Sequence, residues 1–101
     1  MNMNIQNLMK EAKKMQKDLQ KTQEDLANTT YEGSSSLVKI KLNGNKELLE
    51  VKINIDESLE KDDIEMLEDM ILVAFNDAVA KVDADKEHKL GKYGSGLTGL
   101  M

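Results

Sequence analysis

The stretch Met66–Val82, MLEDMILVAFNDAVAKV, decides the fold because its apolar residues recur with the period of an α-helix. Their spacing alternates between three residues and one, and further apolar positions widen the apolar face to roughly 260°. A helix packed on one sheet needs a stripe only a little over about 100° wide. We therefore expect this helix to be buried on two sides, by its own sheet and by a second copy of the chain. The residues expected in this core and dimer contact are Leu67, Met70, Ile71, Ala74, Phe75 and Ala78.

The length of 101 residues predicts one domain over residues 1–90, followed by a flexible glycine-rich tail over 91–101. The chain has no cysteine, which excludes disulfides and cysteine metal sites and is consistent with a reducing compartment. The single histidine, His88, has no second ligand at helical spacing, so we expect no metal site and no cofactor. No membrane-span or signal-peptide pattern is present, and we expect a cytoplasmic protein with no membrane partner.

Charge is unevenly distributed along the chain, although its net value is -5. Residues 1–21 carry five lysines against two acids, whereas residues 56–70 carry one lysine against eight acids. A molecule polarised in this way can bind a polyanion through its basic part. The net charge is therefore a poor guide to the partner.

Residues 4–27 are predicted to form a long helix, because apolar side chains follow a heptad seam and no glycine or proline interrupts them. Five lysines point away from that seam: Lys10, Lys13, Lys14, Lys17 and Lys21. Two interpretations stay open at this stage. The lysines either form an ordinary solvated helix face or make a basic stripe on an arm about 36 Å long that follows a phosphate backbone.

Residues 29–55 alternate apolar and polar side chains, which predicts a three-stranded antiparallel meander with one apolar face. We expect a short first strand at residues 29–32, a turn at 33–36 and a hairpin turn at 43–46, in which Asn and Gly tolerate positive φ. The expected register pairs Ile40 with Leu49 and Val38 with Val51.

A second helix is predicted at residues 63–89, after an acidic turn in which Asp62 or Asp63 caps the first helical residues. The turn lacks the alternating ligands and central glycine of a calcium loop. The chain also has no phosphate loop, no paired nucleophile and base, and no dinucleotide fingerprint. We therefore expect neither enzymatic activity nor a small-molecule substrate.

Five blocks of sequence, taken in order, resemble the YbaB/EbfC family of bacterial nucleoid-associated proteins. They are QNLMKEAKKMQ at 6–16, LVKIKLNG at 37–44, DESL at 56–59, MLED at 66–69 and AFNDA at 74–78. The resemblance implies an α+β fold with an α-β-β-β-α subunit, in a tight homodimer with long projecting N-terminal helices. It also implies binding of double-stranded DNA in the nucleoid. Two departures are DESL, where the family often has DPSL, and the glycine-rich tail, which replaces one rich in proline and methionine.

The expected mechanism is contact between lysines and DNA phosphates, which releases counterions and makes affinity fall with salt. The candidate DNA-binding residues are Lys10, Lys13, Lys14, Lys17, Lys21, Lys86, Lys89 and Lys92. The chain contains no arginine, the side chain most used to read guanine edges, so weak sequence preference is expected. The alternative function is a dimeric adaptor that grips a protein partner, in recombination or replication complexes.

Overall fold

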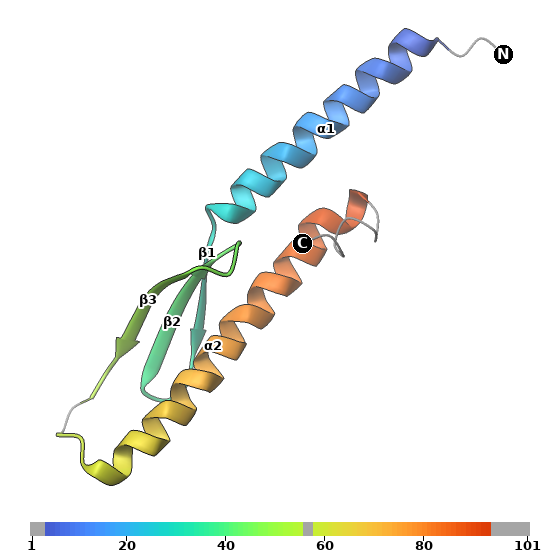
Figure 1. Cartoon of the computed structure of the whole chain (residues 1–101). Coiled ribbons are helices and arrows are strands. Elements are labelled where there is room, and N and C mark those ends of the chain that lie inside the picture. Colours follow the sequence, from blue (N-terminus) through green and yellow to red (C-terminus); the bar gives the residue numbers. More distant parts are fainter. Residues whose placement is uncertain (1–3, 56–57, 94–101) are drawn as a thin grey trace.

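The computed structural model describes residues 4–55 and 58–93, so Asp56 and Glu57 of the acidic turn and tail residues 94–101 lie outside the described residues. Helix α1 (Ile5–Ala27) precedes strands β1 (Thr30–Ser34), β2 (Val38–Asn43) and β3 (Leu48–Ile53) (Figure 1). Helix α2 (Lys61–Leu90) and a short 3-10 helix, η1 (Gly91–Tyr93), complete the described chain. This order confirms the predicted α-β-β-β-α subunit and its α+β class.

The three strands form one antiparallel meander in the order β1-β2-β3, and α2 packs across β1 and β2. All six residues of β3 are exposed, because α2 does not extend over that strand. The core lies between α2, the first two strands and the end of α1. Its buried members are Leu26, Tyr31, Val38, Ile40, Leu42, Ala74, Ala78, Val82 and Leu90.

The predicted register of the β2–β3 hairpin is wrong by two residues, since Val38 pairs with Ile53 and Ile40 pairs with Val51. One residue of the shift comes from the loop, where the Asn43 N–H donates to the Glu47 carbonyl at 3.1 Å and so closes a three-residue loop. The second comes from an irregularity between residues 41 and 42. The shift of two keeps Val51 and Ile53 on their predicted face, whereas Leu48, between the irregularity and the loop, is shifted by one and pairs with Leu42.

The predicted location of positive φ in this hairpin is also corrected, because Lys46 takes the left-handed conformation with φ of 62°. Asn43 stabilises the loop with its side-chain oxygen, which accepts the N–H groups of Asn45 and Glu47 at 2.9 and 3.0 Å. Gly44 serves another purpose. A Cβ at this position would overlap the Leu26 carbonyl, so glycine lets the hairpin contact the end of α1.

Gly33 was predicted in a turn, but it lies inside β1 and pairs with Ile40. A Cβ on Gly33 would overlap the carbonyl oxygen of Ala74 and the backbone nitrogen of Ala78. Glycine on the strand and alanine on the helix therefore allow β1 and α2 to approach closely. This glycine is explained by close packing of β1 on α2, and the turn-like sequence around it did not indicate that packing.

The start of α2 is corrected from residue 63 to Lys61. The Glu60 N–H donates to the Asp63 carboxylate at 3.0 Å, and the Asp63 N–H donates to the Glu60 carbonyl at the same distance. Asp63 thus lies in the first turn and reaches back, rather than preceding the helix as its cap. At α1 the cap is Asn4, whose side-chain oxygen accepts the Gln6 N–H at 3.0 Å, one residue before the helix begins.

Helix α1 extends away from the rest of the molecule, as Figure 1 shows. Leu26 is its one buried residue, and Leu19 packs partly against the core. The principal extents of 75 × 20 × 15 Å reflect this arm. Residues 5–18 of α1 are all exposed, so this part of the helix depends on its N-cap and on intrinsic propensity.

The six residues predicted for the core and dimer contact fall into two groups on α2. Ala74 and Ala78 are fully buried against the sheet, and Leu67, Met70 and Ile71 pack partly against the same core. Phe75 differs, because 36% of its surface is exposed. The chain alone therefore covers one side of α2 and leaves the second apolar side open.

Candidate nucleic-acid interface

The five predicted lysines of α1 form one exposed band along the arm. Lys10, Lys13, Lys14, Lys17 and Lys21 are all exposed. At 100° per residue they occupy an arc of roughly 100°, centred opposite the apolar seam, over an axial length of about 17 Å. Among the described residues, no carboxylate oxygen lies within 4.0 Å of their ammonium groups. Their charge is therefore free to act on a partner.

Lysines outside α1 are arranged differently, because five of those on the sheet, the β2–β3 loop and α2 pair with acids. Lys39 lies 3.8 Å from Glu32, Lys41 3.3 Å from Glu50, Lys46 2.8 Å from Asp83, Lys81 3.4 Å from Asp77 and Lys89 3.0 Å from Asp85. Such exposed pairs stabilise a fold only slightly. They do, however, offset the positive potential of these lysines at short range.

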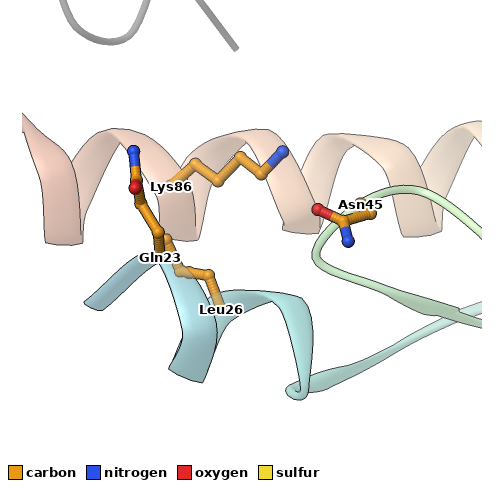
Figure 2. A pocket seen from close by; sticks show the side chains of 4 residues that line it. All are labelled: Gln23, Leu26, Asn45 and Lys86. Atoms are coloured by element: carbon orange, nitrogen blue, oxygen red, sulfur yellow. The ribbon is translucent and has the colours of Figure 1, made fainter. Parts of the chain in front are cut away.

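The three predicted lysines near the end of α2 do not extend the band on α1. Lys89 is paired with Asp85, and the ammonium of Lys92 lies 5.1 Å from the centre of the Tyr93 ring. Lys86 is half-buried in a hollow between α2, the end of α1 and the β2–β3 loop (Figure 2). The pairing of Asp85 with Lys89 had a signal in the sequence, since residues four apart on a helix are neighbours.

Tyr31 on β1 and Asp85 on α2 form a polar link next to the core. The Tyr31 hydroxyl donates to the Asp85 carboxylate, which also accepts the Lys89 ammonium. Burial, together with the hydrogen bond to Asp85, raises the pKa of Tyr31 to about 12. The same hydrogen bond, with help from Lys89, lowers the pKa of Asp85. This link fastens α2 to the sheet, and its carboxylate also pairs with the charge of Lys89.

A second polar link joins α2 to the outer edge of β1. The Asp77 carboxylate accepts the Ser34 N–H at 3.1 Å, and this hydrogen bond, aided by Lys81, lowers the pKa of Asp77. Lys81 in turn donates to the Glu32 carbonyl at 2.8 Å. Side chains of α2 therefore form hydrogen bonds with some of the backbone groups at the free edge of β1.

An exposed apolar corner lies on the other side of α2, beside β3. Asp83 pairs with Lys46 of the β2–β3 loop, which identifies the side of α2 nearest β3. Leu72, Phe75 and Val79 lie on that side at 100° per residue. On β3, Val51 and Ile53 share a sheet face with the buried Ile40 and Val38, their cross-strand partners, but remain 44% and 39% exposed. The apolar corner is defined by Val51, Ile53, Leu72, Phe75 and Val79.

Metal-binding clusters and membrane-spanning helices are both absent from the described part of the chain. Across residues 4–55 and 58–93, no three His, Asp or Glu side chains are grouped to hold a metal ion. None of the helices described there is long and apolar enough to cross a bilayer. The lysine band and the apolar corner are the features that call for a function.

Comparison with known proteins identifies the family. The model of the YbaB/EbfC DNA-binding family matches residues 1–97. The chain belongs to this family. A nucleoid-associated protein of Lactococcus lactis subsp. cremoris is 42% identical over 97 residues, which cover 94% of this chain and 97% of that protein. A nucleoid-associated protein of Ligilactobacillus salivarius is 36% identical over 100 residues, with coverage of 97% and 95%.

A solved structure shares the fold of this family member. It is an uncharacterized protein from Helicobacter pylori, which superposes with a TM-score of 0.70 at 24% identity and covers 92% of this chain and all of that one. Membership of a nucleoid-associated DNA-binding family therefore agrees with the fold of the described residues. In a DNA-binding family, the five lysines of α1, which have no acidic partner among the described residues, are the first candidates for contact with DNA.

Proposed function

We propose that this protein binds double-stranded DNA in the bacterial nucleoid as a homodimer, chiefly through contacts between the lysines of α1 and DNA phosphates. The observation that carries the proposal is the exposed band of five lysines on an arm that extends from the body. The names of the relatives, all nucleoid-associated proteins, support the same role. The protein works as a binding module in this proposal, with no chemical step.

The apolar corner supports the homodimer. Val51 and Ile53 of β3 and Phe75 of α2 expose apolar surface that the described part of the chain leaves uncovered. A second copy related by a two-fold axis would bury the same residues on both chains, as a two-fold interface requires. Each buried apolar side chain would contribute about 1.5 to 3 kcal/mol to association before the entropic costs. The dimer presents two arms to one ligand.

Phosphates are the expected targets because lysine is a flexible point charge with no acceptor and no planar fork. The chain has no arginine for bidentate contacts with guanine. Each phosphate contact releases counterions, so the logarithm of the binding constant should fall linearly with the logarithm of salt. Binding of this kind depends weakly on DNA sequence.

A charge-reversal experiment tests the proposed interface. In the full chain, Lys10→Glu, Lys14→Glu and Lys17→Glu together should weaken binding to a 30-base-pair duplex by more than about 100-fold. The matched control is Lys39→Glu, Lys52→Glu and Lys61→Glu, which changes net charge equally on exposed residues of the body. We expect the control to bind within about tenfold of wild type, and both variants to sediment as dimers. Equal loss in the two variants would refute a localised interface.

A salt titration separates this function from that of a dimeric adaptor for a protein partner. The exposed seam of α1, with Ile5 70% and Met15 57% exposed, is the observation that favours the adaptor. DNA binding predicts measurable duplex affinity at about 50 mM salt and a steep loss by about 200 mM. An adaptor predicts no duplex affinity even at the lower salt concentration.

A further inference from the structure

An apolar groove runs along α1 on the side away from most of the lysine band. Its lining residues are Met9, Ala12, Lys13, Met15, Gln16, Leu19 and Tyr93, and it encloses about 440 Å³. Six of the seven come from α1, and the seventh is Tyr93 at the end of η1. Met9 and Met15 are 55% and 57% exposed in this groove. The described chain leaves a binding surface of methionine and leucine uncovered.

The position of Tyr93 limits what can fill the groove. Tyr93 is the last residue that the structure describes, and it is one of the residues that line the groove. The following eight residues, GSGLTGLM, have apolar side chains at Leu97, Leu100 and Met101, a spacing of three and one. Residue 94 is bonded to Tyr93, so this segment is joined to the chain at a residue that lines the groove.

We propose that residues 94–101 of the same chain occupy this groove, with Leu97 and Leu100 packed against Met15 and Met9. The reach is sufficient, because the seven residues from Tyr93 to Leu100 span up to about 25 Å when extended. The groove from Leu19 to Met9 covers ten helical residues, or about 15 Å. Unbranched methionine side chains adapt readily to irregular apolar partners, so they suit a segment that alternates leucine with glycine.

The short connection also favours this occupant over a second molecule. A segment tethered by a few residues has an effective concentration in the millimolar range, far above the concentration of free protein in solution. The tail would cover the seam of α1 while leaving Lys10, Lys14 and Lys17 on the other side of the helix. The proposal does not depend on DNA binding, because the groove and these three lysines lie on different faces of α1.

Disulfide trapping tests this placement directly, because the natural chain has no cysteine. The test variant is Met15→Cys with Leu97→Cys in the full chain, and the matched control is Lys17→Cys with Leu97→Cys. Position 17 lies two residues away in sequence but on the opposite side of α1. In a glutathione redox buffer, we expect the test variant to form its disulfide within one chain at least ten times faster than the control. Equal rates overturn the proposal, and so does a disulfide formed only between two chains, which would assign the groove to a second copy.

A measurement without cysteine provides an independent test. The chain has no tryptophan and two tyrosines, of which Tyr31 is buried, so fluorescence quenching by acrylamide reports mainly on Tyr93. Leu97→Ser with Leu100→Ser should raise the quenching constant about twofold, because the tail no longer covers the ring. Thr98→Ser is the control and should leave quenching unchanged. An unchanged constant in the double variant would also overturn the proposal.

Discussion

The arm and the body of this molecule use the same residue type in opposite ways. Five lysines of the body lie beside acids, at separations between 2.8 and 3.8 Å, whereas the five lysines of α1 have no acid within pairing distance in the described residues. Burial divides the two regions in the same manner, since eight of the nine core residues belong to the body. The body, which comprises the three strands and α2, therefore contributes most of the stability of the fold. The arm, α1, presents lysines whose charge no nearby acid offsets. Stability and binding should therefore respond to different substitutions.

The largest effect on the body should come from Gly33→Val. A side chain there collides with the backbone of α2 at Ala74, so the helix must move or the strand must detach. We expect a loss of about 3 kcal/mol or more in the free energy of unfolding, measured by urea denaturation. Asn7→Ala on the exposed arm is the control, with an expected change within about 0.5 kcal/mol. Comparable losses would mean that the arm is packed in solution.

The apolar corner should control self-association. Phe75→Glu combined with Val51→Glu places carboxylates on the exposed side of α2 and on β3. We expect the dimer dissociation constant to rise at least about 30-fold, equivalent to 2 kcal/mol, in sedimentation equilibrium. Lys52→Glu, on the opposite face of the same strand, should leave it unchanged. A double variant that stays dimeric would place the interface elsewhere.

Single neutralisations sharpen the contrast between the two sets of lysines. Lys17→Gln removes one phosphate contact from each arm, and should reduce the slope of log affinity against log salt by about 1.8 per dimer. Lys41→Gln removes a lysine already paired with Glu50, and the slope should stay the same. Titrations on one duplex between about 50 and 200 mM salt provide both slopes. Identical slopes would contradict the division between arm and body.

Tyr31→Phe should affect the body more modestly. It removes the hydrogen bond to Asp85, with an expected cost of about 1 kcal/mol at neutral pH. The folded pKa of Tyr31 is raised from 10.0 to about 12, so its contribution is present below pH 10 and is lost between pH 10 and 12. The variant should lack this part of the alkaline loss when unfolding is followed by circular dichroism. A wild-type alkaline profile in the variant would exclude Tyr31 as its source.

The smallest expected effect is on the stability of the fold at low pH. The pKa of Asp77 is lowered in the folded protein, mainly by the Ser34 N–H. Its contribution is therefore present above the unfolded value of 3.8 and is lost as pH falls through the folded value. When the pH is lowered from 5 to below 3.8, the free energy of unfolding of Asp77→Asn, measured by urea titration, should fall less than that of wild type. A steeper acid loss in the variant would contradict this sign.

Sequence patterns predicted the elements well, because apolar periodicity is a local property of the chain. The period of α2 and the alternation of β2 and β3 both predicted their elements to within a few residues. The register failed because it depends on one loop residue and one irregularity, neither of which changes the alternation. Gly33 was assigned to a turn because a glycine beside three serines is a turn signal. Its contact with Ala74 joins segments 41 residues apart, and no local pattern encodes that contact.

The candidate site was predicted unevenly for a similar reason. The band on α1 follows from helical geometry alone, and the structure places those five lysines on one side of one helix. Lys86, Lys89 and Lys92 sit where several elements meet, and their surroundings depend on tertiary contacts. The hollow around Lys86 combines Gln23 and Leu26 of α1 with Asn45 of the hairpin (Figure 2). Its composition could not be deduced before the chain folds.

The joint between α1 and the body, where Gly44 meets the Leu26 carbonyl, has a mechanical consequence. The arm measures about 34 Å, and its anchoring contacts lie within its last turns. A tilt of about 10° at that hinge displaces the far tip by about 6 Å, by the geometry of a rigid rod of this length. In a dimer, the distance between the N-terminal ends of the two arms would thus depend on a few contacts at the C-terminal end of each α1. Gly44 determines how closely the hairpin approaches α1 at that point.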